Sequence, residues 1–78
     1  MEISTLAEHI VKALVDYPEL VFIKEKKGIS SSILELGVHK TDIGKVIGKK
    51  GATITALRTI LSAAAGKEKR NITVELIE

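Results

Sequence analysis

The stretch Ile43-Gly44-Lys45-Val46-Ile47-Gly48-Lys49-Lys50-Gly51-Ala52-Thr53-Ile54 decides how this chain folds. Its apolar residues form two clusters that bracket a short turn, in which Gly48 and Gly51 enclose two lysines. Glycine permits positive φ angles and lets a second backbone come close. The lysines place mobile positive charge at the tip, and the flanking apolar residues should hold the turn against a core. We therefore predict an anion-binding loop, and the expected anion is a nucleic-acid phosphate.

Helical patterns lie on both sides of this loop. Thr41 is expected to cap a short helix over about 42–47, with Asp42 in its first turn, where the helix dipole favours an acid. A second helix is predicted over 52–65, and Gly66 should end it as the residue just past its C-terminus. The apolar residues of this second helix recur at helical spacing and define its inner face: Ile54, Leu57, Leu61 and Ala64.

The N-terminal part of the chain predicts one more helix. Apolar residues recur at helical spacing from Ile3 to Leu14. Pro18 disfavours helical geometry at the residue before it, so this helix should stop at about Asp16.

Three strands complete the predicted fold. Residues 20–27 are rich in β-branched and aromatic side chains, Gly28 marks a turn, and residues 30–39 alternate apolar with polar side chains. A short connection implies an antiparallel hairpin. Residues 71–77 alternate in the same way and form the third strand, with Ile72 and its alternating neighbours facing inward.

The resulting order is α-β-β-α-α-β within a single domain, residues 1–78. Because two helices separate the second and third strands, the third strand can lie parallel to the second through a right-handed crossover. We therefore predict an α+β fold, in which the 30–39 strand is central and three helices cover one face of a mixed sheet.

Composition and charge narrow the function. The chain has no cysteine, the start Met1-Glu2-Ile3-Ser4 lacks the features of a signal peptide, and no apolar run reaches the length of a membrane span. We expect a cytoplasmic protein that has no membrane partner. The net charge is only +2, but residues 40–51 carry four lysines and one acid, so the positive charge is concentrated around the loop.

The residues of this chain do not have the spacing that the sequence motifs of enzymes require. A P-loop needs four residues between its first glycine and Gly-Lys-Ser/Thr, but only three residues separate Gly44 from Gly48, and Lys50 stands where the hydroxyl belongs. The ten acids are dispersed along the chain, and the two histidines are isolated from each other. We expect no catalytic residue, metal, cofactor or small-molecule substrate.

Aromatic stacking on an exposed sheet is not expected either. Only Tyr17 and Phe22 are aromatic, and both are predicted to be core or helix-end residues. Bases would then have to rest on aliphatic surface, which again points to residues 43–54.

The stretch 43–54 resembles the signature of a KH domain, in which a Gly-x-x-Gly loop joins two helices, and the element order is that of the type II KH fold. Over its whole length the chain is similar to the small bacterial proteins that consist of one KH domain, the KhpA type. Outside the loop, the resemblance rests on Pro18, Leu34-Glu35-Leu36 and Arg58-Thr59. The chain departs from the pattern at Gly37, where a larger residue is expected, and at Lys50, which adds charge to the loop.

The resemblance implies a single-stranded RNA-binding protein of low sequence specificity that acts as an RNA chaperone or post-transcriptional regulator. A KH loop clamps the backbone of about four nucleotides. The implied RNA-binding residues are Ile43, Gly44, Lys45, Val46, Ile47, Gly48, Lys49, Lys50, Gly51, Ala52, Ile54 and Arg58. Among them, Val46 and Ile54 are expected to be at least half structural. The implied protein partners are a second copy of the chain or a larger KH-containing protein of the Jag type.

Two alternatives stay open at this point. In one, the groove or an exposed helix binds a protein, the chain is a dimerising interaction module, and nucleic-acid binding is incidental. In the other, the ligand is single-stranded DNA, because nothing in the loop is suited to read a 2′-hydroxyl.

Overall fold

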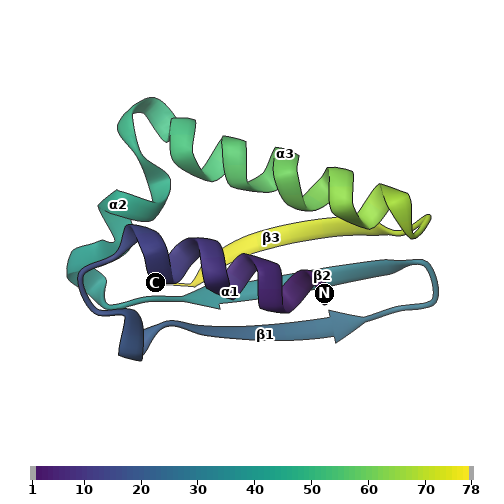
Figure 1. Ribbon diagram of the computed structural model, residues 1–78, viewed down its shortest axis with the longest axis horizontal. Helices are drawn as coiled ribbons and strands as arrows, with labels where there is room; N and C mark the ends of the chain where they lie inside the picture. Colours follow the sequence, from purple (N-terminus) through teal and green to yellow (C-terminus); the bar gives the residue numbers. More distant parts are fainter. Residues whose placement is uncertain (1, 78) are drawn as a thin grey trace.

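The computed structural model describes residues 2–77 and places three α-helices on one face of a three-stranded sheet (Figure 1). Met1 and Glu78, which belong to the predicted domain, lie outside the described residues. The elements are α1 (Ile3–Leu14), β1 (Phe22–Lys27), β2 (Ser31–Gly37), α2 (Ile43–Ile47), α3 (Ala52–Lys67) and β3 (Asn71–Ile77). Single 3-10 turns at Pro18–Leu20, Lys40–Asp42 and Lys49–Gly51 connect them. Within the described part of the chain, no helix combines the length and apolar character required to cross a bilayer.

The sheet has the predicted topology. β2 lies between the other two strands, pairs antiparallel with β1 and pairs parallel with β3. Phe22 faces Gly37 across the antiparallel pair, and Leu34 faces Val74 across the parallel pair. The α+β prediction, with residues 30–39 supplying the central strand, is therefore confirmed.

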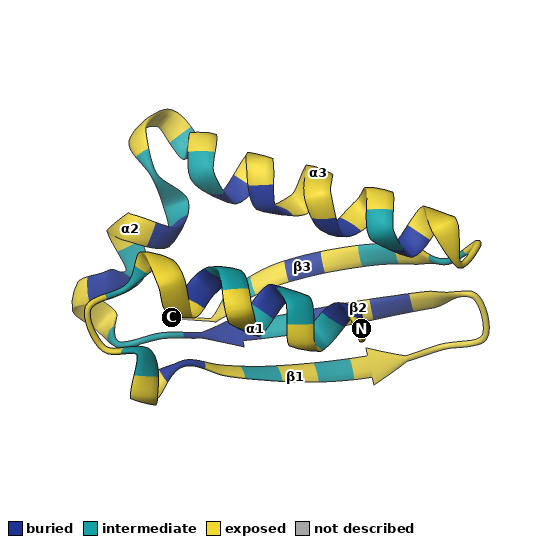
Figure 2. Ribbon diagram, in the orientation of Figure 1, coloured by how far each residue is buried: buried dark blue, intermediate teal, exposed yellow. Residues whose placement is uncertain are grey.

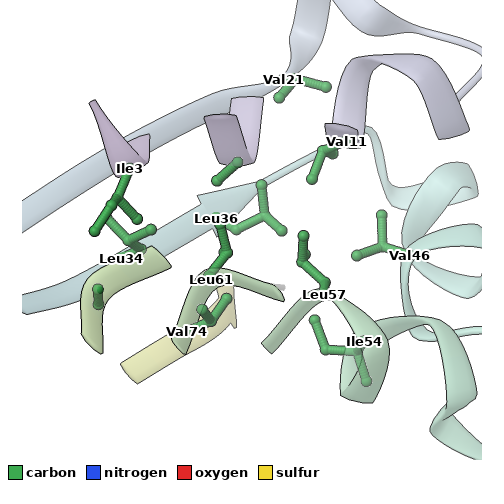
Figure 3. Close-up of a cluster of buried hydrophobic side chains, with 12 residues drawn as sticks. Ile3, Val11, Val21, Leu34, Leu36, Val46, Ile54, Leu57, Leu61 and Val74 are labelled. Atoms are coloured by element: carbon green, nitrogen blue, oxygen red, sulfur yellow. The ribbon is translucent and has the colours of Figure 1, made fainter. Parts of the chain in front are cut away.

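The core lies between the sheet and the helices (Figure 3). Leu34 and Leu36 of the central strand are fully buried, whereas Ile33 on the opposite face is exposed. The helices contribute their inner faces, which Figure 2 shows in dark blue: Ile3, Ala7 and Val11 from α1, and Ile54, Leu57, Leu61 and Ala65 from α3. This packing holds α3 along β3, so the loop that precedes α3 has a fixed position.

The first helix ends two residues earlier than predicted, at Leu14. The carboxylate of Asp42, which is fully buried, accepts hydrogen bonds from the backbone N–H groups of Asp16 (3.1 Å) and Tyr17 (3.0 Å). These amides are bonded to a side chain more than twenty residues away, so they are not available to continue the helix. The pattern around Pro18 cannot reveal this contact, because its acceptor belongs to another part of the fold.

Thr41 does not cap the following helix, contrary to the prediction. It lies inside the 3-10 turn that precedes α2, and the N-cap of this turn is His39. The Nδ1 atom of His39 accepts a hydrogen bond from the backbone N–H of Thr41 (3.2 Å), and the Thr41 hydroxyl lies 2.7 Å from the same nitrogen. The His39 ring also stacks on Tyr17, with 4.5 Å between ring centroids. His39 therefore shapes the segment that leads into α2.

The third helix continues past Gly66, which was predicted to end it. α3 runs to Lys67, and the residue with a left-handed conformation is Lys69 (φ 59°). The N–H of Arg70 bonds to the carbonyl of Ala65 (2.9 Å), and the N–H of Lys69 bonds to the carbonyl of Gly66 (2.9 Å). This is the Schellman pattern of helix termination, formed around a lysine in place of the usual glycine.

Replacing Gly66 with alanine is expected to raise the free energy of unfolding by about 0.5–1 kcal/mol. Gly66 is exposed and helical, and a Cβ atom added there meets nothing within 4 Å, so alanine reduces the entropy of the unfolded chain without a clash. Urea denaturation measures the change. The matched control is Gly51→Ala, which should destabilise the domain because Gly51 has φ +75°. If both substitutions changed the free energy of unfolding in the same direction, the assignment of Gly66 to the body of α3 would be wrong.

Phe22 is not a core residue, contrary to the prediction. It lies on the face of the sheet that the helices do not cover, and 53% of it is exposed. A Cβ atom at Gly37 would lie 2.1 Å from Cε1 of the Phe22 ring. Gly37, which departs from the family pattern, therefore provides the space for this ring on the neighbouring strand.

Candidate nucleic-acid interface

The Gly48-Lys49-Lys50-Gly51 loop joins α2 to α3 at one end of the molecule, at the upper left of Figure 1. Both lysines are exposed, and neither forms an ion pair within residues 2–77. The backbone N–H of Gly51 bonds to the carbonyl of Gly48 (3.1 Å), which closes the turn. The loop therefore presents two uncompensated positive charges on an ordered backbone.

Gly48 is required by both its backbone conformation and its surroundings. Its φ and ψ angles are 76° and 173°, a region that is nearly restricted to glycine. A Cβ atom there would also lie 2.2 Å from Oγ1 of Thr53 and 2.8 Å from its backbone nitrogen. Gly48 thus lets the loop fold back tightly onto the first turn of α3.

The second half of the loop has left-handed backbone conformations at two successive residues. Lys50 has φ 56° and ψ 27°, and Gly51 has φ 75° and ψ 13°. Such a conformation costs a lysine roughly 1–2 kcal/mol, so the surrounding structure must hold it. The helix that follows has no acid in its first turn, where the amide groups and the dipole attract negative charge. This geometry is suited to a phosphate next to the start of α3.

The apolar residues around the loop divide into a buried group and a surface group. Val46 is fully buried and Ile54 is 7% exposed, so both side chains belong to the core and support the loop from there. This agrees with the expectation that Val46 and Ile54 are at least half structural. Ile43 and Ile47 are only partly buried. Gly44 is exposed between them in the chain, and a Cβ atom there would meet nothing within 4 Å. The accessible apolar surface beside the loop is therefore that of Ile43 and Ile47, next to open space at Gly44.

Lys45 belongs to a local ion-pair network. Its Nζ atom lies 3.2 Å from a carboxylate oxygen of Asp16 and 3.9 Å from one of Asp42. Asp42 also holds the two amides that follow α1, so it fixes the base of α2 to the N-terminal part of the fold. The sequence interpretation missed this role of Asp42. No local pattern could have shown it, since the partners are distant in the chain.

Arg58 is directed toward the sheet edge, two helical turns beyond the loop. Its Nε and Nη2 atoms donate to the backbone carbonyl of Val74 in β3, at 3.4 and 3.3 Å. Ala52, the first residue of α3, is exposed at the loop. The structure thus brings together Ile43, Gly44, Ile47, the four loop residues and Ala52 on the surface, with Val46 and Ile54 beneath them. Lys45 and Arg58 are partly engaged by the protein itself.

This chain is similar to known proteins over most of its length. Residues 4–76 match the model of the KhpA/KhpB KH domain. A protein of Halalkalibacterium halodurans named RNA-binding protein KhpA is 48% identical over 75 residues, which cover 96% of this chain and 99% of the relative. Proteins of the same name are 49% identical in Chlamydia trachomatis, with 90% of each chain covered, and 51% identical in Clostridium perfringens, with 92% and 96% covered. The comparison with solved structures gives no significant match.

Proposed function

Because this chain belongs to the KhpA/KhpB family of KH domains, we propose that it binds single-stranded RNA with low sequence specificity. The order α-β-β-α-α-β with a mixed sheet is the type II KH fold. The observation that carries the proposal is the exposed Gly48–Gly51 loop, whose two lysines form no ion pair with any residue from 2 to 77 and stand at the start of a helix that has no acid in its first turn. The relatives' name, RNA-binding protein, supports RNA as the ligand.

In this proposal the loop clamps the sugar–phosphate backbone, and the bases rest on the aliphatic surface beside it. A phosphate accepts hydrogen bonds from amides at the start of α3, while Lys49 and Lys50 attract it electrostatically. Bases pack against Ile43 and Ile47, and the absence of a side chain at Gly44 lets the strand come close. About four nucleotides fit such a site, so little sequence information is read.

The wider role that we propose is that of a non-enzymatic RNA chaperone or post-transcriptional regulator in the cytoplasm, without a cofactor. Low specificity supports this role, because a protein that accepts many single-stranded segments can act on many transcripts. We also propose that the chain pairs with a second copy or with a larger, Jag-type KH protein. A dimer would place two short sites on one assembly and raise the avidity for longer RNA.

Replacing Gly44 with alanine is expected to weaken RNA binding at least about fivefold while the fold is kept or slightly stabilised. The added methyl group meets no protein atom within 4 Å, so it should interfere only with a strand that approaches the loop. Fluorescence anisotropy with a labelled single-stranded RNA measures the affinity. Gly66→Ala is the matched control, because it makes the same change at another exposed helical glycine. If both variants bound the RNA with equal affinity, Gly44 would not be part of the RNA-binding site.

Two further measurements separate this proposal from the alternatives. Competition between RNA and DNA oligomers of one sequence tests the ligand class, and equal affinity would extend the function to single-stranded DNA. Sedimentation tests the interaction-module alternative. A tight dimer that ignores changes in the loop but dissociates on polar substitutions in α3, together with no measurable RNA binding, would replace the RNA-binding proposal.

A further inference from the structure

The single phenylalanine and the single tyrosine of this chain lie at the same end of the sheet. Phe22 is the first residue of β1 and pairs with Gly37, the last residue of β2. Two residues beyond Gly37, the ring of His39 stacks on Tyr17, with 4.5 Å between the ring centroids. We call Tyr17, Phe22 and His39 the aromatic end of the sheet.

The ring of Phe22 rests on the backbone of the neighbouring strand and is otherwise open to solvent. A Cβ atom at Gly37 would lie 2.1 Å from Cε1 and 2.2 Å from Cζ of this ring, so the ring lies over Gly37. Phe22 is nevertheless 53% exposed, because no helix covers this face of the sheet. Ile77 pairs with Gly37 from the other side and is 41% exposed. Exposed aromatic rings on a sheet are the surfaces on which single-strand-binding proteins stack nucleobases.

The aromatic end is also the end of the molecule that holds the loop (Figure 1). β1 begins there, β2 and β3 end there, and the chain passes from Gly37 through the turn Lys40–Asp42 into α2. Helix α2 presents Ile43 and Ile47, the accessible apolar surface of the candidate nucleic-acid interface. Only the short segment 38–42 therefore connects the aromatic end to that interface.

Lys40 places a positive charge in this connecting segment. It is exposed in the 3-10 turn and forms no ion pair within residues 2–77. Lys40 belongs to the lysine-rich stretch 40–51, but it has no role in the site at the loop. A cation between two apolar surfaces is suited to a phosphate of a strand that passes from one surface to the other.

The acids near the aromatic end are largely buried or neutralised. Asp42 is fully buried, and the carboxylates of Asp16 and Glu35 each lie within 3.3 Å of a lysine Nζ atom. Glu19 and Glu75 are exposed, and neither forms an ion pair among the described residues 2–77. This surface therefore has little net positive charge. Its contribution to RNA affinity should come from stacking and from one phosphate contact, not from general electrostatic attraction.

On these observations we propose that Phe22 forms a second contact for RNA. A base of the strand that the loop clamps stacks on the Phe22 ring, and Lys40 contacts a phosphate between the two places. The prediction that no ring is available for stacking depended on Phe22 being buried, and the exposure of Phe22 removes that obstacle. This inference rests on the proposed function, since the loop supplies the anchor that holds the strand.

NMR spectroscopy with tetraadenylate and octaadenylate as ligands tests the stacking directly. Because the chain contains one phenylalanine, its ring signals belong to Phe22. Adenine is used because a purine has a large stacking surface. The amide signals of Lys49 and Lys50 report when the loop is occupied. With the loop occupied, the octamer should shift the ring protons of Phe22 upfield through the ring current of a stacked base, whereas the tetramer should not shift them.

Affinity measurements on variants test the energetic contribution. Phe22→Leu should lower the affinity for the octamer about fivefold or more without changing its salt dependence, because a stack is lost and no charge is lost. The affinity for the tetramer should not change. Phe22→Tyr should retain the octamer affinity to within about twofold, because tyrosine keeps the aromatic face. A ring over a cross-strand glycine also stabilises a sheet, so circular dichroism must show that each variant is folded at the temperature of the titration.

Lys40→Gln tests the phosphate contact. A single-strand phosphate contact contributes about −0.7 to the slope of log affinity against log salt, so this variant should make the octamer slope shallower by about 0.7. The matched control is Lys12→Gln, which removes one positive charge from α1 and should leave the slope unchanged. All comparisons are made between variants on one oligomer, because a longer strand offers more registers to the loop.

The failure of this inference differs from the failure of the proposed function. Equal octamer affinity in Phe22→Leu and the unaltered protein would overturn the second contact, as would Phe22 ring signals that stay in place while the octamer occupies the loop. RNA binding at the loop would stand in both cases. If the octamer does not shift the amide signals of Lys49 and Lys50, the proposed function itself fails.

Discussion

Replacing Lys49 and Lys50 with aspartate should lower the affinity for single-stranded RNA by well over tenfold at about 100 mM salt. The change replaces two attractive charges with two repulsive ones at the exposed tip of the loop, where a phosphate would lie. The fold should survive, because neither lysine forms an ion pair within residues 2–77 and aspartate tolerates the left-handed conformation of residue 50. Anisotropy measures the affinity, and circular dichroism verifies the fold.

The matched control for this variant is Lys12→Asp with Lys24→Asp. It changes the net charge by the same amount on α1 and β1, away from the loop. A small decrease in affinity is expected from the lower net charge alone. If the loop variant binds RNA as well as this control does, then the loop does not clamp the strand, and the proposed mechanism is wrong even if the chain binds RNA elsewhere.

Replacing Asp42 with alanine should lower the free energy of unfolding by about 3 kcal/mol. The carboxylate is fully buried and accepts charge-assisted hydrogen bonds from two backbone amides, so its removal leaves both donors without a partner in a partly buried position. A domain of this size is stabilised by only about 4–12 kcal/mol in total, so the loss is a large share of its stability. Urea denaturation at neutral pH measures the change.

Asp16→Ala serves as the control for this second variant. Asp16 forms an ion pair of 3.2 Å with Lys45, but its side chain is 68% exposed, so the substitution should cost less than about 1 kcal/mol. Asp42→Asn should fall between the two, because an amide oxygen can still accept one of the two hydrogen bonds. An Asp42→Ala cost as small as that of Asp16→Ala would show that water readily replaces the carboxylate.

Much of the candidate site was predictable from local sequence. The two glycines, the two lysines between them and the flanking helices are adjacent in the chain, so their spacing specifies the loop, and the structure exposes both lysines as expected. The open position of Gly44 agrees with the space expected there. The engagement of Lys45 by two carboxylates and of Arg58 by Val74 could not be predicted, because those partners come from other elements.

The sequence by itself determined the element order, the strand that is central and the buried faces of β2 and α3, because apolar periodicity and glycine placement act over a few neighbouring residues. The tertiary structure alone decided where α1 stops, which residue ends α3 and why β2 has a glycine at position 37. In each of these cases the deciding group is brought in by folding: the Asp42 carboxylate for α1, and the Phe22 ring for Gly37. At the end of α3, Arg70 is held by the β1–β2 hairpin, and the turn closes around Lys69 in place of Gly66. Such contacts depend on distances between segments far apart in the chain, and local patterns contain no information on those distances.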